Sequence, residues 1–357
     1  MMGSTSKEIN RQLSKLQKGG KVYLPVGEYA IEETIVVDTP CVKVEGEVWN
    51  YSSDPNGVFE SDYGTKLRMK RNDIPAIMMS ENCVLGGNII KDIGIQGNIV
   101  GMDTRNSFDY RNPSGSAGLY FDNQRIDQAE FSKISFCGLA SAVCANGEAE
   151  IDACTFEKLN TDGCCIGIYF APQASYYVMF RNCIVADTPT YGFFVNGENR
   201  KIHNLDIDNI KFVRNGGAFS ENHMYPSAAV CFYQVSNCAV RNCTFDFPGV
   251  YWHYDADAKS NEERHISKQK TSALWIEGSK NRIIGNTFSH SSSESIVVYG
   301  DDNIIMNNIV DGYIVISGKR NVIAGNVFTK DTAKIILLED AEETQLINVN
   351  ETRIEKI

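Results

Sequence analysis

The sequence has no apolar run long enough to cross a membrane, and its N-terminus has no apolar stretch that would serve as an export signal. The chain of 357 residues carries 34 Lys and Arg against 45 Asp and Glu, a formal net charge of −11. Charges of both signs are interspersed, so the clustered basic residues of a nucleic-acid groove are absent. We therefore expect a soluble cytoplasmic protein without nucleic-acid or membrane partners.

The 11 cysteines lack the paired short spacings of a zinc site, and the five histidines are scattered. Most cysteines lie inside apolar runs, such as residues 229–232. Free Cys packs as a small apolar side chain in a reducing compartment, so core packing is favoured over disulfides. Phosphate-loop, haem and Ser/His/Asp patterns are also absent. We therefore expect no metal and no cofactor.

A short phrase built on two asparagines five residues apart recurs in the C-terminal half. Its first asparagines are residues 237, 281, 303 and 321, so the steps between them are 44, 22 and 18 residues. A unit of about 22 residues predicts a solenoid, in which no single turn buries its own apolar face. The second asparagines of the phrases are predicted to form a hydrogen-bonded structural ladder; they are Asn242, Asn286, Asn308 and Asn326.

The rest of the chain reads as short strands without a long amphipathic helix, which predicts a single all-β domain with parallel strands. Residues 1–20 are expected to form a capping helix, with a capping box from Thr5 to Glu8 and an apolar face of Ile9, Leu13 and Leu16. Residues 21–340 would form the solenoid. Residues 341–357 turn polar and are expected to cap its other end.

Four long connections interrupt the repeat, at residues 48–64, 100–116, 214–227 and 246–271. Each is expected to follow the second strand of a turn, so that all four stack into one wall beside a binding face. Their mixed aromatic and charged side chains suit a sugar, because C–H faces stack on rings and hydroxyls bond to carboxylates. Ordinary polar loops are the alternative interpretation. The candidate substrate-binding residues are Asp109, Glu221, His223, Trp252, His253, Tyr254 and Asp255.

The strands that open successive turns carry apolar residues at outward as well as inward positions. If Leu274 and Ile276 point inward, the residue between them points outward. An apolar stripe over five turns is large for a monomer, so we expect it to be buried between subunits. The predicted stripe is Cys144, Phe194, Trp275, Val297 and Val315.

The Leu-Pro-x-Gly-x-Tyr turn within residues 21–37 and the Asn-rich repeats resemble the pectate-lyase-like right-handed β-helix superfamily. A narrower resemblance, carried also by residues 242–249 and 274–288, is to the inulin fructotransferase and difructose-anhydride hydrolase family. That resemblance implies a trimer with active sites between neighbouring subunits. It also implies an enzyme that cleaves or rearranges fructofuranosyl linkages.

The family resemblance further implies a pair of acids, one just after a Gly that closes a strand and one past the next strand. Glu148, which follows Gly147, takes the first place, with Glu where the family has Asp. Asp162 is the assigned proton donor for the second place, and Glu157 is the reserve. Such a bond breaks through an oxocarbenium-like state, in which one acid protonates the leaving oxygen and one carboxylate stabilises charge or activates the attacking hydroxyl.

Because a chain without an export signal meets small imported sugars, hydrolysis of a cyclic difructose anhydride is the favoured reaction over its formation from inulin. A polysaccharide lyase or uronic-acid epimerase is the second hypothesis. Those enzymes often need a Ca²⁺ cluster of carboxylates, and the sequence shows no compact Asp/Glu cluster on adjacent strands. A non-catalytic glycan-binding β-helix is the third hypothesis.

Overall fold

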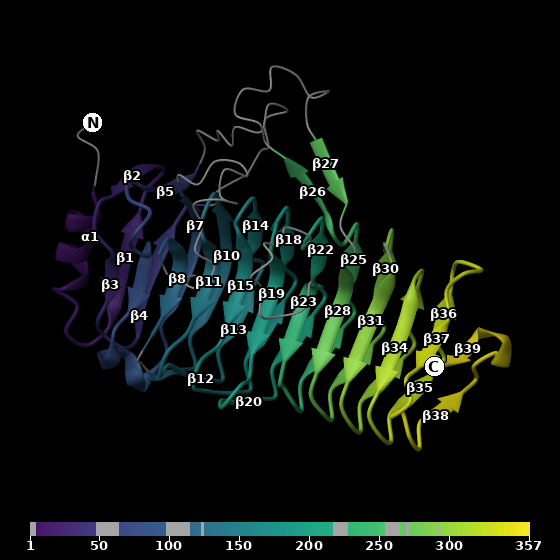
Figure 1. The fold of residues 1–357 in the computed structure, drawn as a ribbon. Helices are drawn as coiled ribbons and strands as arrows, with labels where there is room; N and C mark the ends of the chain where they lie inside the picture. Colours follow the sequence, from purple (N-terminus) through teal and green to yellow (C-terminus); the bar gives the residue numbers. More distant parts are fainter. Residues whose placement is uncertain are drawn as a thin grey trace.

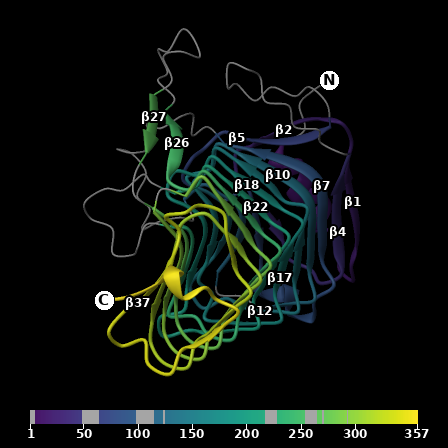
Figure 2. The same cartoon turned by 90° about the vertical axis from the view of Figure 1, so that its right-hand side faces the viewer.

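The chain winds into an elongated solenoid of parallel strands, seen from the side in Figure 1 and along its axis in Figure 2. This computed structural model describes residues 5–47, 64–97, 115–122, 125–216, 228–253, 265–268, 271–291 and 293–357. Its three parallel sheets have 21, 12 and four strands. We call them the long, front and base sheets, and one turn of the solenoid a coil. The parallel β-helix predicted from the repeat is confirmed.

The long sheet receives two short strands from most coils, which form two rows. The first row is β1 (Gly20–Leu24), β4 (Val42–Gly46), β13 (Thr155–Glu157), β17 (Met179–Arg181), β21 (Asp206–Asp208), β24 (Ala239–Arg241), β29 (Arg282–Ile284), β32 (Ile304–Met306), β35 (Val322–Ala324) and β38 (Gln345–Ile347). The second row is β2 (Gly27–Ile31), β5 (Thr65–Met69), β14 (Asn160–Asp162), β18 (Ile184–Ala186), β22 (Lys211–Val213), β25 (Thr244–Asp246), β30 (Thr287–Ser289), β33 (Ile309–Val310) and β36 (Val327–Phe328). The strands β7 (Ile89–Gln96) and β10 (Glu130–Cys137) extend through both rows.

The front sheet follows the second row in each coil, and the base sheet closes some coils below it (Figure 2). The front sheet is β3 (Ile35–Val37), β6 (Ile77–Met79), β8 (Ala117–Phe121), β11 (Ser141–Ala145), β15 (Ile166–Phe170), β19 (Tyr191–Asn196), β23 (Ala228–Tyr233), β28 (Ser272–Glu277), β31 (Glu294–Tyr299), β34 (Tyr313–Ser317), β37 (Ile335–Leu337) and β39 (Ile354–Lys356). The base sheet is β9 (Arg125–Asp127), β12 (Glu150–Asp152), β16 (Ala174–Tyr176) and β20 (Lys201–His203).

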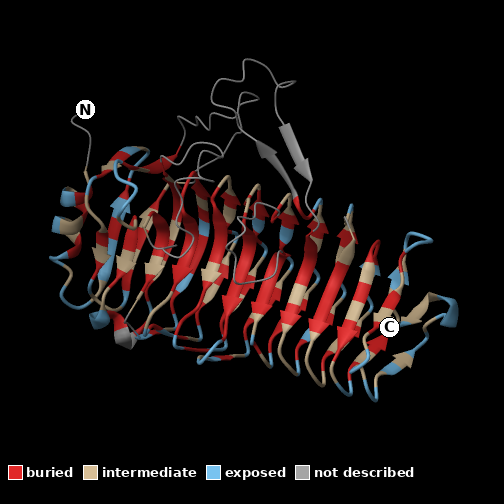
Figure 3. Cartoon of the chain, viewed as in Figure 1, coloured by how far each residue is buried: buried red, intermediate tan, exposed pale blue. Residues whose placement is uncertain are grey.

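The interior of the coils is apolar and continuous from one end to the other (Figure 3). Aromatic rings stack along the solenoid axis because equivalent positions of successive coils lie about 4.8 Å apart. Phe156 stacks on Phe131 at 4.8 Å and on Phe180 at 4.3 Å between ring centroids. The buried cysteines occupy the same kind of position: Cys154, Cys183 and Cys243 all lie in this core.

The helix α1 (Ser6–Leu13) covers the N-terminal end of the core with Ile9 and Leu13. The predicted capping box is wrong, because the Thr5 side chain makes no cap hydrogen bond. The Glu8 carboxylate instead accepts from Arg11 at 2.8 Å. At the other end, β38, β39 and the short 3-10 helix η4 (Glu351–Arg353) add a last coil within the segment predicted as a cap.

The asparagine ladder is present, and it begins one coil later than predicted. Cys238 and Cys243 hold the ladder positions of the preceding coil, since their backbone N–H groups donate to Asn281 and Asn286 at 3.0 and 2.9 Å. Asn242 lies one residue out of register, exposed, and donates to Asp208 at 2.9 Å. The repeat phrase therefore slips by one residue at this coil, and Asn242 is not a ladder member.

Three of the four long connections share one corner, between the second row and the front sheet. They follow β7, β22 and β25 and precede β8, β23 and β28. The connection at 48–64 differs from the prediction, because it follows β4 of the first row and precedes β5 of the second row. The first coils have a tight turn at Pro25 between those rows, so an insertion is accommodated there as readily as at the other corner.

Candidate functional site

The two predicted catalytic carboxylates lie on opposite sides of the front sheet, one before and one after its strands. Glu148 is exposed in the turn after β11, and Asp162 is half-buried at the end of β14, before the chain enters β15. A five-residue front strand such as β15 separates the two corners by about 16 Å, at roughly 3.3 Å per residue. Paired glycosidase carboxyls are about 5–9.5 Å apart. A joint role of Glu148 and Asp162 therefore needs two chains.

Glu157, the reserve acid, lies on β13 of the long sheet. It accepts hydrogen bonds from Arg181 at 3.0 Å and Asn182 at 3.2 Å, and Lys158 lies at 4.0 Å. Burial raises the pKa of Glu157, but these hydrogen bonds and the positive charges outweigh it, so the pKa is lowered. A carboxyl with a lowered pKa holds its proton weakly, which is unfavourable for a proton donor.

Five of the predicted substrate-binding residues lie outside the described residues: Asp109, Glu221, His223, Tyr254 and Asp255. Trp252 and His253 belong to β26 (Val250–His253), which pairs antiparallel with β27 (His265–Lys268). This hairpin leaves the coil after β25 and projects from the corner where the front sheet begins (Figure 1).

The predicted apolar stripe forms one register column on the outer face of the front sheet. Trp275 pairs with Cys231 and Val297, and Val297 pairs with Val315. Within one chain, however, Cys144, Phe194 and Val297 are already at most 2% exposed. Trp275 and Val315 are the stripe members that remain half-exposed. The apolar surface available to a partner is therefore smaller than expected from the sequence.

The outer face of the front sheet also brings aromatic rings and a carboxylate together. The rings of Trp275 and Tyr299 lie 5.0 Å apart with an interplanar angle of 32°. Glu277 comes two residues after Trp275 on β28 and therefore points to the same face, where its register partner is Tyr299. Towards the N-terminus, Tyr169 lies 5.5 Å from Phe194 on the same outer face.

Glu277 is a carboxyl of this face whose pKa is raised. Burial raises its pKa, and the negative charge of Glu198 raises it further. Among the residues that the structure describes, Glu277 has no ion-pair partner, and the Trp275 Nε1 atom is buried without a hydrogen-bond acceptor. The sequence contains a signal for this residue, because an acidic residue alternates with Trp275 just before a strand-closing Gly.

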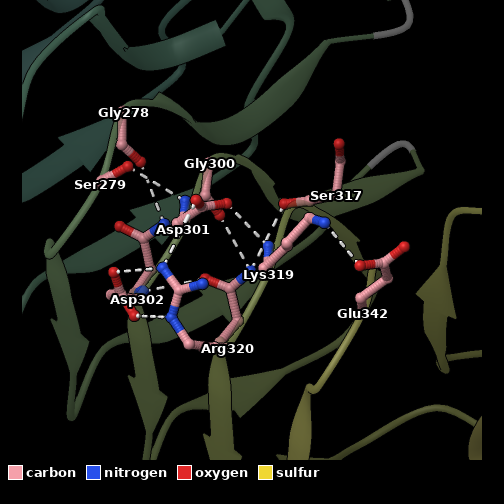
Figure 4. A network of polar contacts seen from close by, with 11 residues as sticks. Gly278, Ser279, Gly300, Asp301, Asp302, Ser317, Lys319, Arg320 and Glu342 are labelled. Carbon is pink, nitrogen blue, oxygen red and sulfur yellow. Dashed lines mark hydrogen bonds and ion pairs between the residues drawn. The ribbon is translucent and has the colours of Figure 1, made fainter. Parts of the chain in front are cut away.

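The turn that follows Glu277 is held rigidly by glycine and by a polar network. Gly278 has φ +142°, and a Cβ there would lie 2.0 Å from the Val235 carbonyl oxygen, so only Gly fits. Figure 4 shows the network beside this turn. Ser279 Oγ accepts from Asp301 N–H at 3.1 Å, and Asp302 accepts from Arg320 Nε and Nη2 at 2.8 and 3.0 Å. This support limits the movement of the strand ends that carry Glu277 and Tyr299.

The described part of the chain contains neither a metal-binding cluster nor a membrane-spanning helix. In these residues no three His, Cys, Asp or Glu side chains gather in a way that could hold a metal ion. Over the same ranges, no helix is long and apolar enough to cross a membrane.

No family model and no curated protein matches this sequence. Among solved structures, the chain is similar to DFA-IIIase from Arthrobacter chlorophenolicus A6 without its lid in complex with GF2, with TM-score 0.69 and 11% identity over 99% of this chain and 95% of that chain. The same enzyme in complex with DFA-III gives TM-score 0.65 at 11% identity, over 98% and 92% of the two chains. ORF18 of Geobacillus virus E2 gives 0.54 at 14% identity, over all of this chain and 62% of that chain. This chain therefore has the parallel β-helix fold of these structures.

Proposed function

We propose that this protein is a carbohydrate-active enzyme that cleaves or rearranges fructofuranosyl linkages. The preferred reaction is hydrolysis of a cyclic difructose anhydride, with its formation from inulin as the related transfer. Three sequence stretches resemble enzymes of this kind, and DFA-IIIase shares the fold over nearly the whole of both chains. Fold alone does not specify chemistry, so the proposal depends on the site.

The observation that carries the proposal is the arrangement of Trp275, Tyr299 and Glu277 on one outer face. Two tilted rings 5.0 Å apart offer an apolar platform for the C–H face of a furanose. The carboxyl of Glu277 beside them can bond to a sugar hydroxyl or give a proton to a glycosidic oxygen. An apolar lining with a few convergent polar groups is typical of small-ligand sites.

The reaction itself needs an acid and a carboxylate base, and no cofactor. The acid protonates the leaving oxygen as the C–O bond breaks, and the carboxylate stabilises the oxocarbenium-like centre or deprotonates the attacking group. Water as the attacking group gives hydrolysis. A hydroxyl of the same substrate gives a cyclic dianhydride.

The protein is also proposed to act as a homotrimer. In such an assembly Glu148 of one chain could approach Asp162 of the next, which one chain by itself does not bring together. Val315, a half-exposed member of the stripe outside the ring platform, would contribute apolar contact area on the front sheet.

The test is incubation of the purified protein with inulin, levan, sucrose and difructose anhydrides, with products identified by mass spectrometry. Opening of a dianhydride to a linear disaccharide, by addition of one water, is the expected result. Polygalacturonate serves as the control from the lyase class, and an unsaturated product from it would replace this proposal. Unchanged fructans and dianhydrides would reject it.

A further inference from the structure

We propose that Glu277 is the proton donor of this enzyme and that Glu198 is the carboxylate base that acts with it. The inference rests on the proposed function, because it assigns roles within a fructofuranosyl-cleaving site. It differs from the pair Glu148 and Asp162 suggested by the sequence, since both groups come from one chain and one face.

The register of the front sheet places the two carboxylates near each other. Asn196 pairs with Tyr233 in the next coil. Phe232 pairs with Ile276, so the residues that follow them, Tyr233 and Glu277, lie opposite each other in neighbouring coils. Two coil steps amount to about 10 Å. Glu198 follows Asn196 by two residues, and its N–H donates to Asn196 Oδ1 at 2.9 Å. This turn keeps Glu198 beside the column that contains Glu277.

The register separation of about 10 Å is close to the longer of the two carboxyl spacings found in glycosidases. Glycosidase carboxyls about 6.5–9.5 Å apart act by direct attack of a water, whereas closer pairs use a covalent intermediate. The charge of Glu198 raises the pKa of Glu277. Glu198 itself is exposed to solvent.

The surroundings of Glu277 suit a sugar that donates and accepts hydrogen bonds. The Nε1 of Trp275 is a buried donor with no acceptor among the described residues. Burying such donors without partners costs free energy, which a ligand oxygen would offset.

The proton of Glu277 passes to the glycosidic oxygen as the bond from that oxygen to the anomeric carbon breaks. The oxygen of a water forms the new bond to the anomeric carbon, and the water proton passes to Glu198. The products are two hydroxyl groups, and exchange with solvent returns Glu277 and Glu198 to their starting forms.

The groups that face Glu277 determine how its titration should appear. They are Glu198 from the turn after β19, Cys231 and Tyr233 from β23, and Tyr299 from β31. Glu198 is the carboxylate among them whose charge raises the pKa of Glu277. Removing its charge should therefore lower the pKa of Glu277, and the loss of activity at high pH should begin at a lower pH.

The experiment compares Glu277→Gln, Glu277→Asp, Glu198→Gln and the control Glu81→Gln, an exposed residue of η1 (Glu81–Leu85). Turnover is measured on the dianhydride or fructan that the wild type converts, and on an aryl fructofuranoside whose nitrophenolate leaves without protonation. For Glu277→Gln we expect kcat to fall by at least ~100-fold on the natural substrate. On the aryl substrate it should fall by less than about tenfold, because no proton is needed.

The remaining outcomes distinguish failure of the Glu277 and Glu198 assignment from failure of the proposed function. Glu198→Gln should reduce kcat on both substrates and shift the high-pH limb of the wild-type profile towards acid. Glu277→Asp keeps the carboxyl and should retain that limb at reduced kcat, provided its circular dichroism matches the wild type. An active wild type whose Glu277→Gln form is equally active on both substrates, or equally impaired on both, overturns the assignment alone. A wild type that converts no fructan or dianhydride overturns the proposed function.

Discussion

The side chains of Asn286 and Asn308 are joined across one coil, with Asn286 Nδ2 donating to Asn308 Oδ1 at 3.0 Å. Asn308 Oδ1 also accepts from the Asn286 backbone N–H at 2.9 Å, and its Nδ2 donates to Ile283 O at 3.0 Å. Both residues are fully buried. The ladder therefore supplies hydrogen-bond partners to backbone groups at a corner where sheet hydrogen bonds do not.

Replacing a central ladder residue should be strongly destabilising. Asn308→Ala leaves the Asn286 N–H and the Ile283 carbonyl buried without their present partners. At ~1–3 kcal/mol for each unsatisfied buried group, the free energy of unfolding should fall by about 3 kcal/mol. Urea denaturation followed by circular dichroism measures it. Asn326→Ala is the matched control at the half-exposed end of the ladder, and an equal loss there would contradict this explanation.

Shortening the aromatic stack should create a costly cavity. Phe156 is 0% exposed between Phe131 and Phe180, so Phe156→Ala removes contacts on both faces of its ring. We expect a loss of about 3–5 kcal/mol in thermal or chemical unfolding. Phe156→Leu fills most of the space and should lose clearly less. Similar losses for the two variants would show that ring stacking, rather than cavity volume, dominates.

The carboxylate of Glu45 should make stability depend on acid pH. The ammonium of Lys21 at 2.7 Å, with those of Lys43 and Lys91, lowers the pKa of Glu45 to about 2. A carboxyl with a lowered pKa stabilises the folded state above its ordinary value near 4.5, and this contribution is lost as pH falls towards 2. Glu45→Gln should therefore be less stable than wild type at neutral pH.

The difference between wild type and Glu45→Gln should shrink as the pH is lowered through that window. Urea midpoints at about pH 7 and at about pH 2.5 test it. Glu32→Gln, at an exposed residue, removes one negative charge as a control for net charge. A difference that stays constant across the window would refute the role assigned to the three lysines.

Removing the ring of Trp275 should weaken sugar binding more than it slows the chemical step. Trp275→Ala deletes the larger half of the platform that it forms with Tyr299. We expect KM to rise roughly fivefold to tenfold on the converted fructan or dianhydride, with a smaller change in kcat. Tyr177→Asn removes a 69% exposed ring elsewhere on the surface and should leave KM unchanged.

Introducing a charge on the outer face of the front sheet should dissociate the proposed trimer. Val315→Asp places a carboxylate among apolar side chains of the stripe, since Val315 pairs with Val297. Light scattering should give three times the mass of one chain for the wild type and one chain for the variant. Val322→Asp, half-buried on the first row of the long sheet, is the control. A wild type with the mass of one chain would rule out the trimer.

The architecture could be predicted because a solenoid is a local structure repeated. The step from Asn281 to Asn303 is one coil, and the register of β29 and β32 follows it. The prediction failed where a residue type changed: Cys243 replaced Asn as the ladder member, and the phrase then aligned Asn242 one residue out of register. Periodicity identifies the coil, but which of two neighbouring residues points inward depends on its partners in the next coil.

The candidate site could not be found by the same reasoning. Residues such as Glu198 and Glu277 are 79 positions apart in the sequence, and only the front-sheet register places them two coils apart. Conversely, Glu148 and Asp162 are close in sequence, but Glu148 follows the front strand β11 whereas Asp162 precedes the next front strand, β15. Separation in sequence follows the path of the chain around each coil. Two side chains can react together only if they are close in space, which here depends on how many coils separate them along the axis.

The sequence by itself determined the coil: its repeat length, its apolar interior and the asparagines that join successive turns. These follow from burial and backbone hydrogen bonding, which act between neighbouring coils and leave a periodic trace. Only the tertiary structure decided which outward side chains meet. It placed Glu277 beside Trp275 and Tyr299 and within the field of Glu198, because side chains on the outer face come together through sheet register rather than through sequence proximity.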